Sequence, residues 1–199
     1  MANMNTLGRP LEFDPEKAID AAVEVFWRKG YESTSMTDLL EAMKLSKSSL
    51  YQTFGSKQQL FERCLSRYAD RLSAEMANDL KEAKSGRSFI EDTFGGVADT
   101  AQQPEGAKGC LIANSANEFG QREPALAVPV SDGLNRFARI FMDAVVKGQA
   151  EGSISADADP RALGNYLIGT MNGLRTMIKA GADRRSAKGM VTLILKALN

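Results

Sequence analysis

Four signals for the start of a helix follow one another within the first 60 residues, and their close spacing limits the fold more than any other feature. The residues that can cap a helix N-terminus are Asp14, Ser35, Ser46 and Ser56. Each precedes apolar residues that recur at helical spacing, and Gly30 and Gly55 are typical of helix ends. We therefore expect four helices between residues 14 and about 83.

The second and third of these helices are short, and only a few residues join them. Met43 is the last apolar residue of the second helix, and the third is expected from Lys47 to Phe54 with Leu50 facing inward. Two short helices joined in this way are typical of a helix-turn-helix, whose second helix enters the major groove of DNA. The third helix is roughly 12 Å long at the helical rise, which matches the width of that groove.

Segments rich in glycine and proline divide the rest of the chain into stretches that again favour helices. Breaks are expected at residues 85–86, 95–96, 102–106, 120–124, 152–160 and 181–184. Because no stretch alternates polar and apolar residues as a strand does, we predict an all-α chain. We expect an N-terminal arm and three-helix helix-turn-helix domain over residues 1–57. A C-terminal helical domain over residues 58–199 begins with the fourth helix, which links the two.

The charge of the chain is balanced overall but uneven along its length. The formal net charge is zero, which by itself favours no nucleic-acid partner. Residues 44–71 nevertheless carry six basic and two acidic side chains, so this segment can attract phosphate. No run of about 18 apolar residues occurs, and the N-terminus lacks the pattern of a secretory signal. We therefore expect a cytoplasmic protein with no membrane partner.

The chain contains no histidine, and this absence argues against most enzyme classes. It removes the usual nucleophile systems, the imidazole base and nearly all common zinc sites. Two cysteines, Cys64 and Cys110, are too few for a disulfide framework. We expect no enzyme, no metal and no cofactor. An enzyme with Cys110 as its nucleophile is the alternative, which the missing base disfavours.

Several segments in the first third of the chain resemble the TetR family of transcriptional regulators. They are Gly8-Arg-Pro10, Ala22-Val-Glu-Val-Phe26, Gly30-Tyr31, Thr34-Ser-Met-Thr-Asp38 and the run from Leu45 to Lys57. The resemblance implies a sequence-specific DNA-binding regulator, a repressor that a small-molecule effector releases from a palindromic operator. An architectural DNA binder without ligand control is the alternative that the long C-terminal domain disfavours.

The resemblance also implies which residues contact double-stranded DNA. They are Ser35, Thr37, Lys47, Ser48, Ser49, Tyr51, Gln52 and Lys57. The alternative is that Tyr51 packs against the core and that the polar residues only solvate a short helix. Two interpretations remain open for Arg9, either insertion into the minor groove or an arm without a fixed position.

A short DNA-reading helix makes few contacts, so specificity requires two copies of the chain on two half-sites. The resemblance implies a homodimer through the last two helices. The residues expected at that interface are Gly169, Gly173, Leu174, Val191, Ile194 and Leu198. The alternative is that these helices close the core of a single chain.

The resemblance further implies a cavity for an unknown small-molecule effector in the C-terminal domain. Aromatic residues with a few polar groups are typical of such sites. The residues expected there are Phe94, Cys110, Asn114, Phe137, Phe141, Tyr166 and Arg175.

The segment Gly109-Cys-Leu-Ile112 resembles an element found in a subgroup of TetR-like regulators, some of which respond to oxidants or electrophiles. An alternative function is therefore a redox-responsive or electrophile-responsive regulator that acts through Cys110. Lys108 is the nearby cation in the sequence that could favour a thiolate. The other interpretation treats Cys110 as a small buried apolar residue.

Overall fold

The computed structural model describes residues 13–119 and 123–199, and it is all-α over these residues. Gly8, Arg9 and Pro10 lie outside the described residues, as does the remainder of the expected arm. The helices are α1 (Pro15–Lys29), α2 (Met36–Met43), α3 (Lys47–Phe54), α4 (Lys57–Glu82), α5 (Gly86–Asp99), α6 (Pro104–Lys108), α7 (Leu111–Phe119), α8 (Pro124–Ala150), α9 (Pro160–Lys179), α10 (Arg184–Leu195) and a final 3-10 turn, η1 (Lys196–Leu198). The predicted fold class is confirmed.

The first four helices begin where the capping side chains predict. Asp14 accepts a hydrogen bond from the amide of Glu16 at 3.0 Å, so the first turn of α1 has an acceptor for a free N–H group. Ser46 and Ser56 act in the same way at the starts of α3 and α4. The predicted helix starts are therefore correct in this part of the chain.

The predicted break at Gly95 and Gly96 is wrong, because both residues lie inside α5. Glycine lowers helix propensity by only about 1 kcal/mol. The buried residues Phe89, Phe94 and Val97 pack the helix into the core on both sides of the glycine pair. Tertiary packing therefore outweighs the local preference for a break.

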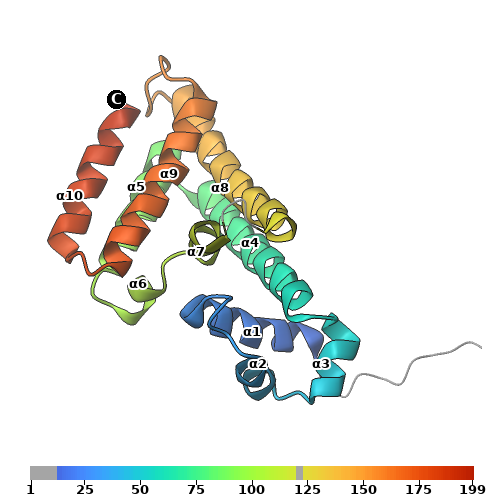
Figure 1. Cartoon of the computed structure of the whole chain (residues 1–199). Helices are drawn as coiled ribbons and strands as arrows, with labels where there is room; N and C mark the ends of the chain where they lie inside the picture. The colour runs from blue at the N-terminus through green and yellow to red at the C-terminus, as the bar shows by residue number, and fades with distance from the viewer. Residues whose placement is uncertain (1–12, 120–122) are drawn as a thin grey trace, which may run out of the picture.

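Two groups of helices lie at opposite ends of α4 (Figure 1). We call α1–α3 the head and α5–α10 the body. The head packs against the N-terminal part of α4, and α8 packs along α4 in the body. Within the body, α8 and α9 lie side by side, while α10 packs against α5 and α9. A single continuous helix thus contacts both groups.

A cluster of aromatic rings connects the head to the body. The cluster contains Phe26 of α1, Tyr31 of the turn that follows α1, Phe61 of α4 and Phe119 of α7. The ring centroids of Phe26 and Phe61 are 4.7 Å apart, and those of Tyr31 and Phe119 are 5.3 Å apart. Such tilted and edge-on pairs are favourable arrangements of aromatic rings. The head is therefore held against both α4 and α7.

A helix that spans a membrane needs about 20 mostly apolar residues. Over the described ranges 13–119 and 123–199, no helix is both long enough and apolar enough to cross a bilayer.

Candidate nucleic-acid interface and ligand cavity

Helix α3 has one buried face and one polar, outward face. Leu50 and Phe54 are almost completely buried against the head and α4. The side chains of Lys47, Ser48, Tyr51 and Gln52 are exposed, whereas Ser49 is partly covered and its hydroxyl lies 2.9 Å from the Ser46 hydroxyl. Tyr51 is 42% exposed, so its ring does not pack into the core. The buried pair fixes the rotation of the helix and thereby the direction of its polar face.

A tight turn sets α2 and α3 relative to each other. Lys44 adopts the left-handed conformation at a φ of 54°, and the amide of Leu45 donates to the Leu40 carbonyl at 3.1 Å. These bonds satisfy carbonyl groups at the end of α2, as an αL helix end does. The turn therefore brings α3 into position within three residues, Lys44 to Ser46.

The start of α2 is fixed by a reciprocal capping box. The Ser35 hydroxyl accepts from the Asp38 amide at 3.1 Å, and the Asp38 carboxylate accepts from the Ser35 amide at 2.9 Å. The ammonium of Lys29 lies 2.7 Å from the other Asp38 oxygen. The hydrogen bond from Lys29, followed by those from Ser35, lowers the pKa of Asp38 to about 2. Ser35 and Thr37 remain exposed beside this cap, so their DNA contacts stay a prediction.

Lys57 lies at the first position of α4, and its ammonium is placed by an aromatic ring. The Nζ atom is 4.3 Å from the centroid of the Tyr31 ring, within the range of a cation–π interaction. Burial is the main cause that raises the pKa of Tyr31, so the ring stays uncharged at neutral pH. The contact holds Lys57 at the surface between head and α4, and its expected phosphate contact stays a prediction.

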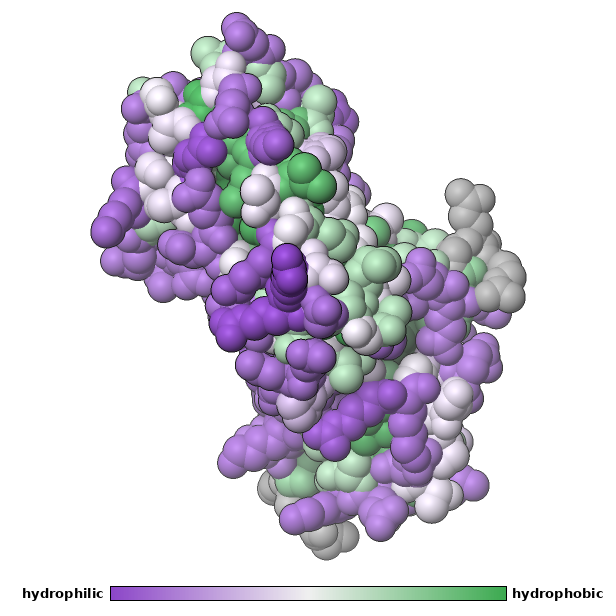
Figure 2. Space-filling view, turned by 90° about the vertical axis from the view of Figure 1, so that its left-hand side faces the viewer, coloured by the Kyte–Doolittle hydropathy of each residue, from purple (hydrophilic) through white to green (hydrophobic). Residues whose placement is uncertain are grey.

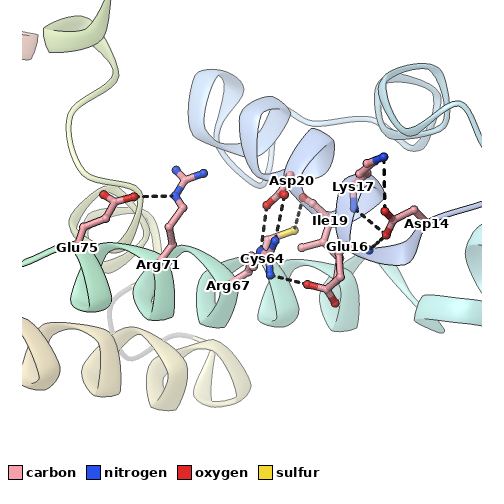
Figure 3. Close-up of polar contacts among 9 residues, drawn as sticks. All are labelled: Asp14, Glu16, Lys17, Ile19, Asp20, Cys64, Arg67, Arg71 and Glu75. Atoms are coloured by element: carbon pink, nitrogen blue, oxygen red, sulfur yellow. Dashed lines mark hydrogen bonds and ion pairs between the residues drawn. The ribbon is translucent and has the colours of Figure 1, made fainter. Parts of the chain in front are cut away.

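An ion-pair group joins α4 to α1 (Figure 3). The Arg67 guanidinium donates to both oxygens of Asp20, at 3.0 and 3.1 Å, and to Glu16 at 2.5 Å. Nearby, the buried Cys64 thiol lies 3.9 Å from the Ile19 carbonyl oxygen. A guanidinium that bonds both oxygens of one carboxylate also fixes orientation. This contact fixes the orientation of α1 relative to α4.

A second set of contacts joins the head to the segment around α6 and α7. The indole N–H of Trp27 donates to the Gly109 carbonyl at 3.2 Å, and Lys108 pairs with Glu24 at 2.9 Å. The Glu118 carboxylate accepts from the amides of Tyr31 and Glu32, at 3.1 and 2.8 Å. These partners are more than 80 residues apart in the chain, so no local pattern could have indicated them.

A cavity of about 250 Å³ lies in the body and is lined by residues of α4, α5, α8 and α9 together with Cys110. Of the seven residues expected there, Cys110, Phe137, Phe141 and Arg175 line it. The lining residues that the sequence analysis did not assign to this cavity are Leu72, Glu75, Met76, Asp79, Asp92, Thr93, Gly96, Val97, Ile168, Met171 and Asn172. They range from buried, as Met171 is, to exposed, as Asp79 is, and helical spacing alone does not distinguish a cavity wall from a packed core.

Three of the residues expected at this cavity lie elsewhere. Phe94 is fully buried behind Phe141, with the ring centroids 5.9 Å apart. Asn114 turns toward the head, where its amide donates to the Lys108 carbonyl at 2.8 Å. Tyr166 is 41% exposed on the outer face of α9. Their assignment to the cavity is therefore corrected, because the helix rotation directs each side chain away from it.

Cys110 is buried, and the Tyr68 hydroxyl donates to its sulfur at 3.8 Å. The ammonium of Lys108 lies 2.9 Å from Glu24 and 5.0 Å from the centre of the Trp27 ring, so it is engaged with the head. A reactive thiol needs access and a nearby cation that favours the thiolate. The burial of Cys110 fits the interpretation as a small apolar side chain and gives the sensor hypothesis no support.

The expected interface residues on α9 and α10 separate into two groups. Leu174, Val191, Ile194 and Leu198 are buried in the core of the single chain, so the expectation that they offer apolar surface is wrong. Gly169 and Gly173 are exposed, and a Cβ atom built on either meets nothing within 4 Å. The two glycines therefore remain candidates for a close approach by another chain.

Exposed apolar side chains flank these glycines. Tyr166, Gly169, Gly173 and Met177 recur at helical spacing and share one face of α9, and Met177 is 50% exposed. On α10, Leu193 is 64% exposed. Figure 2 views the side on which α10 lies, where apolar side chains gather in the upper half between hydrophilic ones. We call these residues of α9 and α10 the outer face.

Comparisons with known proteins identify the family. The family described as bacterial regulatory proteins, tetR family, matches residues 18–64, and the tetracyclin repressor-like C-terminal domain matches residues 86–194. The uncharacterized HTH-type transcriptional regulator YezE of Bacillus subtilis is 31% identical over 97% of this chain and 100% of its own length. The HTH-type transcriptional repressor ComR of Escherichia coli is 31% identical over 88% of this chain and 84% of its own.

A solved structure extends these similarities to three dimensions. A cysteine mutant of the TetR family transcriptional regulator CifR, complexed with double-strand operator DNA, is 29% identical to this chain. It superposes with a TM-score of 0.83 over 96% of this chain and 100% of that one. The helix-turn-helix with its outward polar face agrees with the match to the N-terminal family model. The helical body agrees with the match to the C-terminal one. The chain therefore belongs to the TetR family and is a DNA-binding transcriptional regulator.

Proposed function

We propose that the chain acts in the cytoplasm as a homodimeric repressor that leaves a palindromic operator when a small molecule occupies the cavity of the body. In this proposal residues 1–57 bind DNA, residues 58–199 bind the effector and form the dimer, and α4 links the two. The observation that carries it is the polar face of α3, which a buried Leu50 and Phe54 hold outward. Such a rigid, exposed helix suits insertion into the major groove.

The DNA contacts in this proposal come from three neighbouring places. Lys47, Ser48, Ser49, Tyr51 and Gln52 belong to α3, and Ser35, Thr37 and Lys57 lie at the starts of α2 and α4. Exposed lysine ammonium and hydroxyl groups suit phosphate oxygens, while Tyr51 and Gln52 can reach base edges. The similarity to CifR, which was solved on operator DNA, supports this arrangement.

The dimer in this proposal forms through the outer face of α9 and α10. Gly169 and Gly173 leave open space over the α9 backbone, so another helix can approach closely. Tyr166, Met177 and Leu193 supply apolar area around that point of approach. Two copies related by a two-fold axis would then present two α3 helices to the half-sites of a palindrome.

Helix α4 provides the connection between cavity and DNA. Its residues Leu72 and Met76 line the cavity, while its N-terminal half packs against the head. Arg67 binds Asp20 of α1 midway between these regions. A ligand that prefers one position of α4 shifts the population of head positions by its difference in affinity for the two states. The altered spacing of the two α3 helices then weakens operator binding.

A DNA titration tests the assignment of α3. A palindromic operator is first selected from random duplex DNA with the full-length protein. Lys47→Met then removes one positive charge from each half-site, and the slope of log affinity against log salt is expected to fall by about 1.8 for the dimer. Lys84→Met is the matched control, because Lys84 is exposed in the turn between α4 and α5.

The outcome separates a DNA contact from a general effect of charge. Lys84→Met is expected to leave the salt slope and the affinity unchanged. An unchanged slope in Lys47→Met with correctly folded protein contradicts the assignment of Lys47. Failure of the unaltered protein to prefer any palindrome over random duplex rejects the proposed function itself.

A further inference from the structure

The cavity of the body contains a cationic side chain that has no partner among the described residues. Arg175 is half-buried on α9 and lines the cavity. Within residues 13–119 and 123–199, no oxygen accepts a hydrogen bond from its guanidinium and no carboxylate forms an ion pair with it. An arginine carries five N–H donors and is charged at every physiological pH. These donors are therefore available to a molecule in the cavity.

Arg175 lines the cavity together with the buried Cys110, and we call this side of the cavity its inner end. Burial raises the pKa of the Tyr68 hydroxyl, and the nearby charge of Arg175 opposes that shift. The same Tyr68 hydroxyl donates to the sulfur of Cys110, which lines the cavity. The hydroxyl is thus in contact with the sulfur, and the guanidinium lines the same cavity as that sulfur. The polar end of a ligand is expected at this place.

Most of the remaining wall is apolar. Its apolar residues are Leu72, Met76, Val97, Phe137, Phe141, Ile168 and Met171, and the uncharged residues Thr93, Gly96 and Asn172 complete it. An ionic group placed among these side chains loses its hydration without compensation, which costs several kcal/mol. The volume of about 250 Å³ is below the range of about 300–1,000 Å³ that is usual for ligand sites, so the ligand is small. The body of the ligand is therefore a compact hydrocarbon or aromatic group.

Carboxylates surround the outer end of the cavity. Asp79 and Asp92 are exposed and also line an adjoining surface groove, which places them where the cavity opens. Glu75, a third lining carboxylate, lies 3.8 Å from Arg71. The acidic opening repels an anion that approaches Arg175 from solvent. The cation at the inner end and the apolar wall disfavour a cationic ligand that enters fully.

From these features we infer that the cavity binds a small, uncharged ligand with an apolar body and one carbonyl oxygen, which accepts hydrogen bonds from Arg175. The inference rests on the proposed function, since it takes this cavity to be the effector site. A neutral carbonyl oxygen accepts hydrogen bonds from Arg175. Because it carries no net charge, the carboxylates at the opening do not repel it as they repel an anion. It also buries its hydrocarbon part against Phe137, Phe141 and the two methionines.

Four probes of similar size and different charge test the inference by calorimetry on DNA-free dimer. They are benzylacetone, which has a neutral carbonyl, the anion hydrocinnamate, the cation phenylpropylamine, and butylbenzene, which has no acceptor. Benzylacetone is expected to bind at least about tenfold more tightly than each of the others, as a hydrogen bond to a charged donor implies. Trp27 gives a second signal, because it is the one tryptophan of the chain and its ring lies 5.0 Å from that of Tyr68.

Two variants connect the preference to named residues. Arg175→Met keeps a long side chain but removes the donors, so benzylacetone and butylbenzene are expected to bind within about twofold of each other. Arg161→Met, an exposed arginine on the same helix, is the matched control and should keep the preference. Asp79→Asn combined with Asp92→Asn removes negative charge from the opening and is expected to improve hydrocinnamate binding.

The outcomes distinguish the ligand class from the release mechanism. Tightest binding by hydrocinnamate, phenylpropylamine or butylbenzene overturns the inference, as does binding of none of the four by dimer that still binds its operator. Retention of the carbonyl preference in Arg175→Met overturns the role of Arg175. Operator release is measured separately. Tight binding of benzylacetone without release supports the ligand class and contradicts only the proposed release mechanism.

Discussion

The contact between α5 and α8 allows a prediction at a single glycine. Gly86 begins α5 and lies directly against the backbone of α8. A Cβ atom at this position would overlap the carbonyl oxygen of Ala144 and lie 2.5 Å from the amide nitrogen of Gly148. Because these are backbone atoms, no side-chain rotation relieves the overlap, and α5 must move away from α8. The amide of Gly86 also donates to the Glu151 carboxylate at 3.0 Å, and such a displacement strains this bond.

The expected size of the effect follows from these two losses. Overpacking costs about 1–3 kcal/mol, and a weakened hydrogen bond to a charged group adds about 1 kcal/mol. Gly86→Ala should therefore lower the free energy of unfolding by about 2–4 kcal/mol. For a chain of this length that corresponds to a decrease in Tm of roughly 4–16 °C. The change also displaces the α5 wall of the cavity, so ligand affinity should fall together with stability.

Thermal and guanidinium unfolding, followed by circular dichroism at one fixed dimer concentration, measure this effect. Gly95→Ala is the matched control, because Gly95 lies in the same helix and a Cβ there meets nothing within 4 Å. Alanine should stabilise that position by about 0.5–1 kcal/mol. The two substitutions are thus expected to have opposite signs. Equal stability of Gly86→Ala and the unaltered protein would refute the argument from the close α5–α8 approach.

Three further predictions concern the head and the outer face. Met177→Glu is expected to weaken the dimer, because it places a charge on the exposed apolar face of α9; sedimentation should then show monomer with unchanged helix content. Asp38→Asn is expected to lower the Tm at neutral pH. In melts at decreasing pH, the difference in Tm between the two proteins should disappear between pH 3.8 and about 2. The reason is that the pKa of Asp38 is lower in the folded protein than in the unfolded one. Its carboxylate therefore stabilises the folded protein above pH 3.8, and this stabilisation is lost as the carboxylate is protonated. Trp27→Phe is expected to cost about 1–3 kcal/mol in guanidinium unfolding, since it leaves the Gly109 carbonyl without its indole donor. Undiminished stability would show that water replaces that donor.

The sequence by itself determined the helices of the head and the class of the protein. Each N-cap, from Asp14 to Ser56, depends on a side chain and an amide two or three residues away, so the interaction is local and can be seen in the sequence. The outward direction of Lys47, Tyr51 and Gln52 follows from the helical period once Leu50 and Phe54 are placed inside. The predicted helix-turn-helix and the resemblance to TetR regulators, which are not enzymes, are accordingly confirmed.

Tertiary contacts decided the features that depend on residues far apart in the chain. Gly95 and Gly96 stay helical because the rest of α5 is buried against α8 and α10. The free energy of this packing comes from residues distant in the chain, so no local sequence pattern indicates it. Helical spacing alone could not show whether Leu174 and Val191 face their own core or another chain, because both environments favour apolar residues.

The cavity is another feature that depends on residues far apart in the chain. Its walls come from α4, α5, α8 and α9, and of the seven residues that the sequence indicated, Cys110, Phe137, Phe141 and Arg175 line it. Whether Tyr166 points outward and Arg175 inward depends on how α9 is rotated against α8, which their packing sets. Interactions within one helical turn could thus be predicted, because the covalent chain holds the partners together. The cavity and the joints between head and body required the folded chain, because only long-range packing brings those partners into contact.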